Sequence, residues 1–373
     1  MKKRNANMEL LRVCAMLMII VFHIFCNCAY RQLMEYGWYS RPFFYKRFAL
    51  FALISPMGQI GNTIFILISG YFMTSKGKNI NLTQISKKLL LQLGFATVIL
   101  GIISIVAYNK IAMDSSIKLI SFLSFNSSSW FVGYYFAVIV FAKIFLNDFL
   151  QRLTQQNYIM FLLTLFACTQ FLWSRSVIGG LAGGLDTAAI GVFLYALGGY
   201  IKKYNSFEKI RGGVLIILII AMNLLVYGNY YISTVNNILY FNLEGGNVFS
   251  QDIPLYGNTD IIPVVLGIII FELFRRINMS NSRIINFLGS ATFMVYLLHD
   301  NEFVRSIWNT QKWIDLLYND IWLFTKKYVL WTCGTFLAGV LFYIGYVFIG
   351  KLGKLCKHLV LKQTQESYAN GEQ

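Results

Sequence analysis

Two ionisable side chains stand out in the first apolar stretch of the chain, residues 9–30. Arg12 and His23 are eleven positions apart, so in a helix both side chains point the same way, roughly 16 Å apart along the axis. A neutral imidazole accepts a proton near neutral pH, and a guanidinium binds phosphate or carboxylate groups. Ionisable residues are costly inside a membrane and usually face the bundle interior or a wet cavity. The spacing therefore favours a helix with Arg12 and His23 on one functional face.

Structural explanations of the same residues stay open at this point. Arg12 lies near one end of the stretch, where an arginine can extend to the membrane surface. A single histidine in a membrane helix can simply hydrogen-bond to a neighbouring helix. Glu9 precedes Arg12 by three residues on the same side, where it would either orient the guanidinium or form a solvated ion pair.

The elements that must position these residues are membrane helices. The 373 residues are 57% hydrophobic and 13% charged, which predicts an all-α, polytopic integral membrane protein with a single domain over residues 1–373. About ten apolar segments are each near the length that a helix needs to cross the hydrocarbon. The expected spans lie near residues 9–29, 57–74, 89–108, 130–146, 157–174, 186–202, 212–231, 259–275, 284–299 and 328–350.

The net charge of +16 is explained by membrane topology. With both termini in the cytosol, the cytosolic segments hold twenty of the 32 lysines and arginines, the pattern typical of multi-pass proteins. The basic residues form no stripe with interleaved aromatics, so a nucleic-acid partner is not expected. The basic start of the chain, followed by an apolar run without a cleavage site, predicts a retained signal anchor. The six cysteines have no metal-ligand or redox spacing, so neither a metal site nor a disulfide is expected.

Three outer segments are rich in aromatic residues or polar residues. Residues 30–56 and 300–327 carry many aromatics, which form either an interfacial belt or a platform for sugar rings. Trp308, Trp313 and Trp322 belong to the second of these, and residues 313–325 are expected to lie as an amphipathic segment on the membrane. Residues 232–258 are expected to form a polar outer loop.

Five segments follow one another in an order that is typical of one family of membrane enzymes. They read ELLR with His23 at 9–23, GNTIFILISGYF at 61–72, SWFVGYY at 129–135, YALGGYIKK at 195–203, and FLGS with YLLH at 287–299. Together they resemble the membrane acyltransferase-3 family, whose members transfer acetyl and related acyl groups to sugars. Where that family often has arginines after the second span, this chain has Lys87 and Lys88, which lack the bidentate geometry of arginine.

The resemblance implies an O-acyltransferase of the bacterial cytoplasmic membrane. Its donor would be cytosolic acetyl-CoA or another acyl-CoA, and its acceptor a surface polysaccharide or a lipid-linked glycan. No permanently bound cofactor is expected. The printed sequence carries no hydrolase-like domain after the tenth span, so the whole transfer is expected within the membrane part.

Acyl transfer to a hydroxyl requires a base for the proton and a hydrogen-bond donor for the oxyanion of the tetrahedral intermediate. His23 and Arg12 are the predicted catalytic residues, His23 as the base or as a transient acyl carrier, and Arg12 as a ligand of the donor phosphates or as a structural partner. His299, at the outer end of the ninth span, is expected at a similar depth to His23. The candidate substrate-binding and donor-binding residues are Glu9, Asn62, Ser69, Lys87, Lys88, Trp130, Tyr134 and His299.

Two other functions compete with this one. A glycan-precursor transporter or flippase would show paired broken helices and an internal repeat, and the sequence has neither. An acyltransferase for an amino group or a small metabolite would share the same site and differ in its acceptor. The acceptor sugar, the acyl chain, the choice between direct transfer and an acyl-histidine, and the oligomeric state are not fixed by the sequence.

Overall fold

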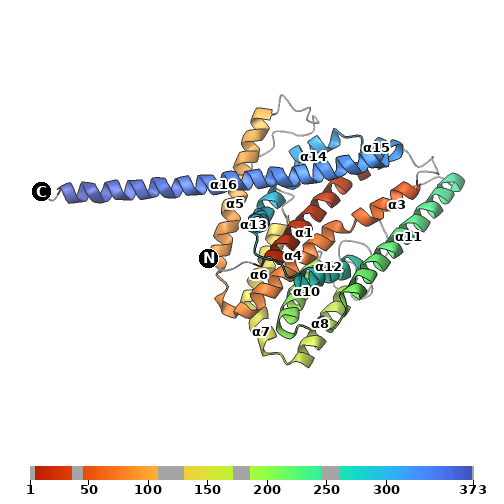
Figure 1. The fold of residues 1–373 in the computed structure, drawn as a ribbon, viewed down its shortest axis with the longest axis horizontal. Helices are drawn as coiled ribbons and strands as arrows, with labels where there is room; N and C mark the ends of the chain where they lie inside the picture. The colour runs from red at the N-terminus through yellow and green to blue at the C-terminus, as the bar shows by residue number, and fades with distance from the viewer. Residues whose placement is uncertain (1–4, 36–44, 108–129, 171–184, 245–260, 372–373) are drawn as a thin grey trace.

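The computed structural model describes residues 5–35, 45–107, 130–170, 185–244 and 261–371, and within these ranges the chain is all α, with no β-strand (Figure 1). The elements are α1 Ala6–Ile24, the π-helical turn η1 Phe25–Ala29, α2 Tyr30–Glu35, α3 Tyr45–Ile54, α4 Met57–Met73, the 3-10 helix η4 Thr74–Asn79, α5 Leu82–Ala107, α6 Trp130–Phe141, the π-helical turn η5 Ala142–Leu146, α7 Asn147–Arg152, α8 Gln155–Gln170, α10 Leu185–Tyr204, α11 Gly212–Glu244, α12 Ile261–Arg276, α13 Arg283–His299, α14 Glu302–Asn309, α15 Trp313–Asn319 and α16 Ile321–Gly371.

A helix occupies each of the ten predicted spans, although residues 108, 171–174, 259 and 260 of those spans lie outside the described part. Five helical segments in the described ranges are long and apolar enough to cross a membrane. They are Ala6–Gln32, Leu82–Ile103, Trp130–Arg152, Gly212–Ile232 and Ile321–Gly353. By contrast α4, α12 and α13 have only 16 or 17 residues. The sequence prediction of an all-α, multi-pass membrane chain is confirmed at this level.

The helices divide into an outer set and a central set. Large apolar side chains are exposed along α5, α11 and α16, as expected of helices that face lipid. By contrast α4 is buried along most of its length, and it contacts α1, α10 and α12. The helix α1 packs against both α4 and α13 in this central set. It carries the predicted catalytic residues Arg12 and His23, whereas α4 and α13 carry predicted binding residues.

A close helix crossing in this centre joins α4 to α10 and depends on two glycines. A Cβ atom on Gly70 would lie 2.0 Å from the carbonyl oxygen of Tyr195, and one on Gly198 would lie 2.4 Å from the carbonyl oxygen of Leu67. Small residues let membrane helices approach until their backbones touch, which increases their van der Waals contact. This contact gives a structural reason for the glycines in the segments at 61–72 and 195–203.

The first turn of α1 is fixed to the end of α12. The Asn7 side chain donates to the carbonyl oxygens of Phe274 at 2.9 Å and Ile277 at 3.1 Å. Close by, the buried Glu272 carboxylate accepts hydrogen bonds from Arg275 and Arg276. These contacts set the depth and the rotation of α1, and with them the positions of Arg12 and His23.

The tryptophans of the stretch 300–327 mostly form protein core, so both interpretations given for them above are wrong for Trp308 and Trp313. Both side chains are fully buried, and they are tied together by a hydrogen bond from Trp313 Nε1 to the carbonyl oxygen of Trp308. Trp308 Nε1 also donates to the Thr335 hydroxyl of α16 at 3.1 Å. The amphipathic segment α15 therefore packs its apolar face on the bundle and not on lipid. Trp322 is exposed.

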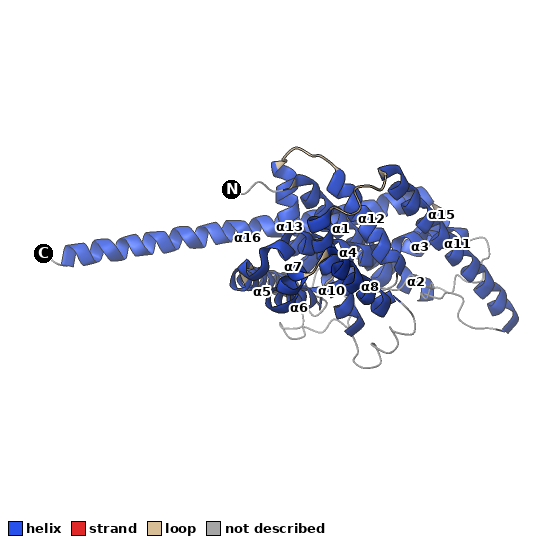
Figure 2. Cartoon of the chain, turned by 90° about the horizontal axis from the view of Figure 1, so that it is seen from below, coloured by secondary structure: helices blue, strands red, loops and turns tan. Residues whose placement is uncertain are grey.

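Other outer segments depart from the expectation or lie outside the described residues. The helix α11 continues to Glu244, so the first part of the expected loop 232–258 is helical. The rest of that loop, and most aromatics of the segment 30–56, lie outside the described residues. The helix α16 has 51 residues, begins before the expected span, and projects well beyond the other helices at its C-terminal end (Figures 1 and 2). All six cysteines are free.

Candidate active site

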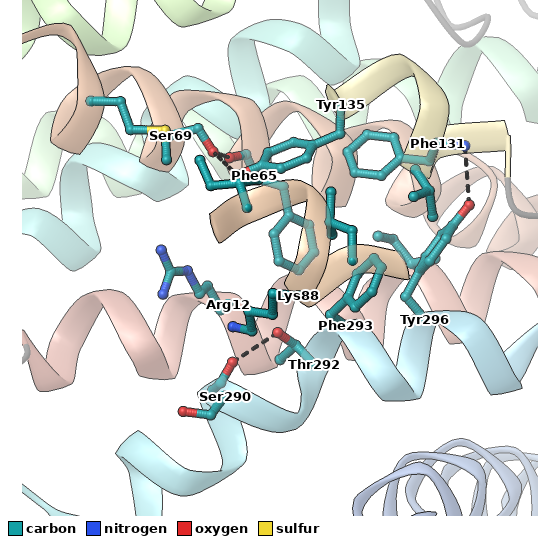
Figure 3. A pocket seen from close by; sticks show the side chains of 16 residues that line it. Arg12, Phe65, Ser69, Lys88, Phe131, Tyr135, Ser290, Thr292, Phe293 and Tyr296 are labelled. Carbon is teal, nitrogen blue, oxygen red and sulfur yellow. Dashed lines mark hydrogen bonds between the residues drawn. The ribbon is translucent and has the colours of Figure 1, made fainter. Parts of the chain in front are cut away.

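The residue Arg12 lies on α1 beside a cavity of about 280 Å³ that side chains of α1, α4, α5, α6 and α13 line (Figure 3). We call this the Arg12 cavity. Arg12 and Lys88 bring positive charge to it, and Ser69, Ser290 and Thr292 bring hydroxyl groups. Glu9 Oε1 accepts a hydrogen bond from Arg12 Nη1 at 2.8 Å, the contact expected from their spacing of three residues. Most of the remaining lining is apolar or aromatic.

A second cavity, of about 190 Å³, adjoins the first and is called the His23 cavity. Three side chains line both cavities, namely Ile19, Phe131 and Tyr296, and we call the boundary that they form between the cavities the neck. The neck is held by a hydrogen bond of 3.3 Å from the backbone N–H of Phe131 to the Tyr296 hydroxyl, visible in Figure 3. The other residues that line the His23 cavity are Phe22, His23, Gly58, Gln59, Asn62, Trp130 and Thr187.

The two histidines of the sequence prediction are in direct contact. His23 Nδ1 lies 2.8 Å from His299 Nε2, and the two rings stack with an angle of 7° between their planes. This contact joins residues 276 positions apart, which confirms that α1 and α13 bring the two imidazoles to the same depth. His299 is almost completely buried, and His23 is partly accessible from its cavity.

The hydrogen bonds fix which ring nitrogens carry protons. His299 Nδ1 lies 2.7 Å from the Tyr296 carbonyl oxygen, which can only accept, so Nδ1 carries the hydrogen. Neutral His299 then has its lone pair on Nε2, and this lone pair must accept from Nδ1–H of His23. It follows that the lone pair of neutral His23 is on Nε2. The chain therefore presents His23 with its basic nitrogen unengaged by His299.

A carboxylate stands beside this histidine pair. Asp300 Oδ2 lies 3.5 Å from His23 Nδ1, and Oδ1 accepts from Asn27 Nδ2 at 2.9 Å and from Arg305 Nε at 2.8 Å. Asn27 belongs to the π-helical turn η1 that follows His23, and π-helical turns are frequent at functional sites. A carboxylate next to the Nδ1 edge stabilises the imidazolium that forms when Nε2 takes up a proton.

The remaining predicted residues divide between the two cavities. Ser69 lines the Arg12 cavity, and its hydroxyl donates to the Phe65 carbonyl oxygen at 2.9 Å, so its proton is engaged. Asn62 and Trp130 line the His23 cavity. Tyr134 lines a small recess beside it.

The two predicted lysines are both exposed but differ in direction. Lys88 also lines the Arg12 cavity, whereas Lys87 lines neither cavity, because neighbouring residues of a helix point about 100° apart. Among the described residues, no group of three or more His, Cys, Asp or Glu side chains is placed to hold a metal ion.

Sequence reasoning missed several side chains of this site as candidates. Gln59 and Thr187 line the His23 cavity, Tyr296 forms part of the neck, and Asp300 and Arg305 complete the charged cluster. A signal existed for three of them, because Asp300 directly follows His299, Gln59 lies one helical turn before Asn62, and Tyr296 begins the YLLH segment. Thr187 and Arg305 have no distinctive local pattern.

These features define a multi-pass, all-α membrane protein in which a buried histidine pair lies beside one of two adjacent cavities. The family model described as an acyltransferase domain, that of the acyltransferase 3 family, matches residues 5–352 of the chain. The chain belongs to this family, and it is therefore an acyltransferase. No curated protein and no solved structure shows a significant match.

Proposed function

We propose that this protein moves an acetyl or related acyl group from cytosolic acyl-CoA to a hydroxyl of an extracytoplasmic or lipid-linked glycan. In this proposal the chain crosses the bacterial cytoplasmic membrane ten times, with both termini in the cytosol. The observation that carries the proposal is the pair of adjacent cavities that share the neck residues, with cationic side chains on one and a histidine base on the other. Family membership supports acyl transfer as the reaction.

The Arg12 cavity would hold the donor. Arg12 and Lys88 suit the phosphates of the nucleotide end, and the apolar lining suits the thin pantetheine arm. Arg12 and His23 are separated by about three helical turns, roughly 16 Å. An extended arm would span this distance and bring the thioester to the neck beside Tyr296. The acceptor hydroxyl would approach from the His23 cavity.

The chemistry follows from the hydrogen bonds of His23. Its Nε2 removes the hydroxyl proton as the acceptor oxygen attacks the thioester carbonyl. The tetrahedral intermediate then collapses, the carbon–sulfur bond breaks, and the coenzyme thiolate takes the proton back from the imidazolium. Asp300 and His299 support the charged ring while it holds the proton. The same Nε2 lone pair would also serve a transient acyl-histidine, and the two routes share all other groups.

The oxyanion of the intermediate needs a hydrogen-bond donor, and Tyr296 is our choice among the residues of the neck. Its hydroxyl oxygen already accepts from the Phe131 N–H, so its own proton remains to be donated. Asn62 and Trp130 line the His23 cavity and are the other candidates. Ser69 fits the role less well because its proton is engaged within α4.

The test compares cells that produce the wild-type chain with cells that produce His23→Ala. Surface glycans are isolated, and mild alkali releases any ester-linked acetate for chromatography. The proposal expects alkali-labile acetate in the wild type and its loss in the variant, at equal protein levels in the membrane. Unchanged acetylation in His23→Ala would refute the proposed function. Accumulation of an unmodified precursor in the cytosol together with unchanged acetylation would favour a transporter.

A further inference from the structure

We propose that the His23 cavity is the acceptor subsite and that it takes a single uncharged sugar ring. In this assignment Gln59, Asn62 and Thr187 hydrogen-bond to the hydroxyls of the ring, and Trp130 covers one of its faces. The inference rests on the proposed function, because it presupposes that His23 acts on a hydroxyl. It adds the class of the acceptor and two residues, Gln59 and Thr187, that neither the motifs nor the family match assigns.

The polar groups of the cavity are available to a ligand. Gln59 and Asn62 are three residues apart and so lie on one face of α4, and Thr187 faces them from the first turn of α10. Within the described ranges, none of the three side chains has a hydrogen-bond partner. A side-chain amide offers two donors and an acceptor, and a threonine hydroxyl offers both functions. This set matches sugar hydroxyls, which also donate and accept.

A second observation comes from the recess that continues from the cavity wall. Gln59, Asn62, Trp130 and Thr187 line both spaces, and the recess is also lined by Thr63. The Thr63 hydroxyl is fully buried and has no hydrogen-bond partner within the described part of the chain. The recess has a volume of about 10 Å³, enough for one water molecule or one hydroxyl group. An acceptor hydroxyl placed there would satisfy an otherwise unpaired buried group.

The lining also indicates the charge and the size of the ligand. The described residues of the His23 cavity include no carboxylate, lysine or arginine, in contrast to the Arg12 cavity with its two cations. A uronate or other charged ring would be buried there without a counter-ion, which is costly. The volume of about 190 Å³ is below the roughly 300–1,000 Å³ that is usual for drug-sized ligands, so one ring fits better than two.

The aromatic side chain of the site has a suitable surface. Trp130 is the first residue of α6, and 55% of its surface is accessible although it lines the cavity. Its ring is braced by Phe131 and Tyr134, with centroid distances of 6.0 and 5.8 Å. An accessible indole that its neighbours hold in place offers an apolar face and a polar N–H, and little entropy is lost on binding. This suits the mixed apolar and polar faces of a sugar.

The experiment uses the full chain in lipid nanodiscs with radiolabelled acetyl-CoA and two matched acceptors, p-nitrophenyl β-glucoside and p-nitrophenyl β-glucuronide. These probes differ only at C6, which is a hydroxymethyl group in the glucoside and a carboxylate in the glucuronide, and transfer to the ring hydroxyls O2, O3 and O4 that both share is compared. The glucoside is expected to be acetylated with a kcat/KM at least about tenfold higher than that of the glucuronide. Gln59→Ala and Thr187→Val are each expected to raise KM for the glucoside by about fivefold to tenfold, the loss of one hydrogen bond, with KM for acetyl-CoA unchanged.

Two control variants make the result specific. Lys88→Met should raise KM for acetyl-CoA and leave KM for the glucoside unchanged. Thr164→Val removes the hydroxyl of a threonine on the exposed face of α8 and should change neither constant. Folding of each variant is checked by its thermal unfolding in the same nanodiscs.

Three outcomes would overturn the acceptor subsite: preference for the glucuronide, an unchanged glucoside KM in both Gln59→Ala and Thr187→Val, or no transfer to either probe. None of these affects the glycan experiment with His23→Ala, which tests the proposed function by itself. If the acceptor subsite is refuted, the proposed function still stands. If the glycan experiment fails, the proposed function and the acceptor subsite are both refuted.

Discussion

The carboxylate of Asp300 offers a sharp test of how the site handles charge. Asp300→Asn removes the negative charge but retains the shape of the side chain and an oxygen that can accept from Asn27 and Arg305. In the proposed reaction His23 becomes positively charged, and Asp300 Oδ2 lies 3.5 Å from its Nδ1. The substitution should therefore slow the chemical step and leave donor binding intact, because Asp300 lines neither cavity.

The magnitude follows from the geometry. Two unit charges 3.5 Å apart at an effective dielectric constant of about 20 attract each other by about 5 kcal/mol. This is an upper bound, since Arg305 Nη2 lies 2.7 Å from the other oxygen of Asp300 and opposes the attraction. Hydrogen bonds to charged groups contribute about 1.5–3 kcal/mol. A loss in this range lowers kcat by roughly 10-fold to 150-fold, since each 1.36 kcal/mol is about tenfold in rate.

The assay measures initial rates of acetyl transfer in nanodiscs at saturating acetyl-CoA and over a range of acetyl-CoA concentrations. Asp320→Asn is the matched control, because Asp320 accepts from the backbone N–H groups of Trp322 and Leu323 at the start of α16, and asparagine caps a helix equally well. Its kcat should change less than about twofold. An unchanged kcat in a correctly folded Asp300→Asn protein would refute imidazolium stabilisation. A raised KM at constant kcat would show instead that Asp300 binds substrate.

Three further predictions concern the helix crossing, the neck and the donor. Gly70→Ala places a Cβ atom 2.0 Å from the Tyr195 carbonyl oxygen and should lower the free energy of unfolding by about 1–3 kcal/mol, measured by thermal or chemical unfolding. In the control Gly94→Ala the new Cβ atom meets nothing within 4 Å, so the free energy of unfolding should not fall. Equal effects of the two substitutions would contradict the close crossing. Tyr296→Phe keeps the wall of the neck and removes its hydroxyl, so kcat should fall about a hundredfold at constant acetyl-CoA KM, and a normal kcat would exclude Tyr296 as the oxyanion donor. Arg12→Met should raise KM for acetyl-CoA about tenfold or more. KM for acetyl-pantetheine should stay nearly unchanged, because this donor lacks the nucleotide phosphates. Equal shifts for both donors would show that Arg12 does not bind these phosphates.

Much of this protein is determined by the local pattern of its sequence. Apolar runs of membrane length fix where the helices are, because a helix satisfies its own backbone hydrogen bonds and needs no partner to form in lipid. The helical repeat alone places Arg12 and His23 on one face of α1, and Glu9 beside Arg12. The direction of each span, read from the charged loops, places His299 at the depth of His23. The motifs in order indicate the family, which the match over residues 5–352 establishes.

Hydropathy does not report which apolar surfaces face lipid and which face protein. The aromatic residues Trp308 and Trp313 illustrate this, because tryptophan is common both at membrane interfaces and in well-packed cores. Their burial depends on α14 and α15 folding back on α16, a contact between elements that no periodicity predicts. The same limit applies to the length of α11, which continues past the point where the apolar run ends.

The chemistry of the site was decided only by tertiary packing. The contact of His23 with His299 joins residues 276 positions apart, and the bond of Asn27 to Asp300 joins residues 273 positions apart. No local pattern of the sequence reports that these pairs are in contact. The tautomer of His23, the neck between the two cavities and the grouping of the α4 amides with Thr187 of α10 arise from side chains on different helices that meet in one place. A one-dimensional pattern sets the rotation and depth of each helix separately, whereas these distances depend on how the helices pack together.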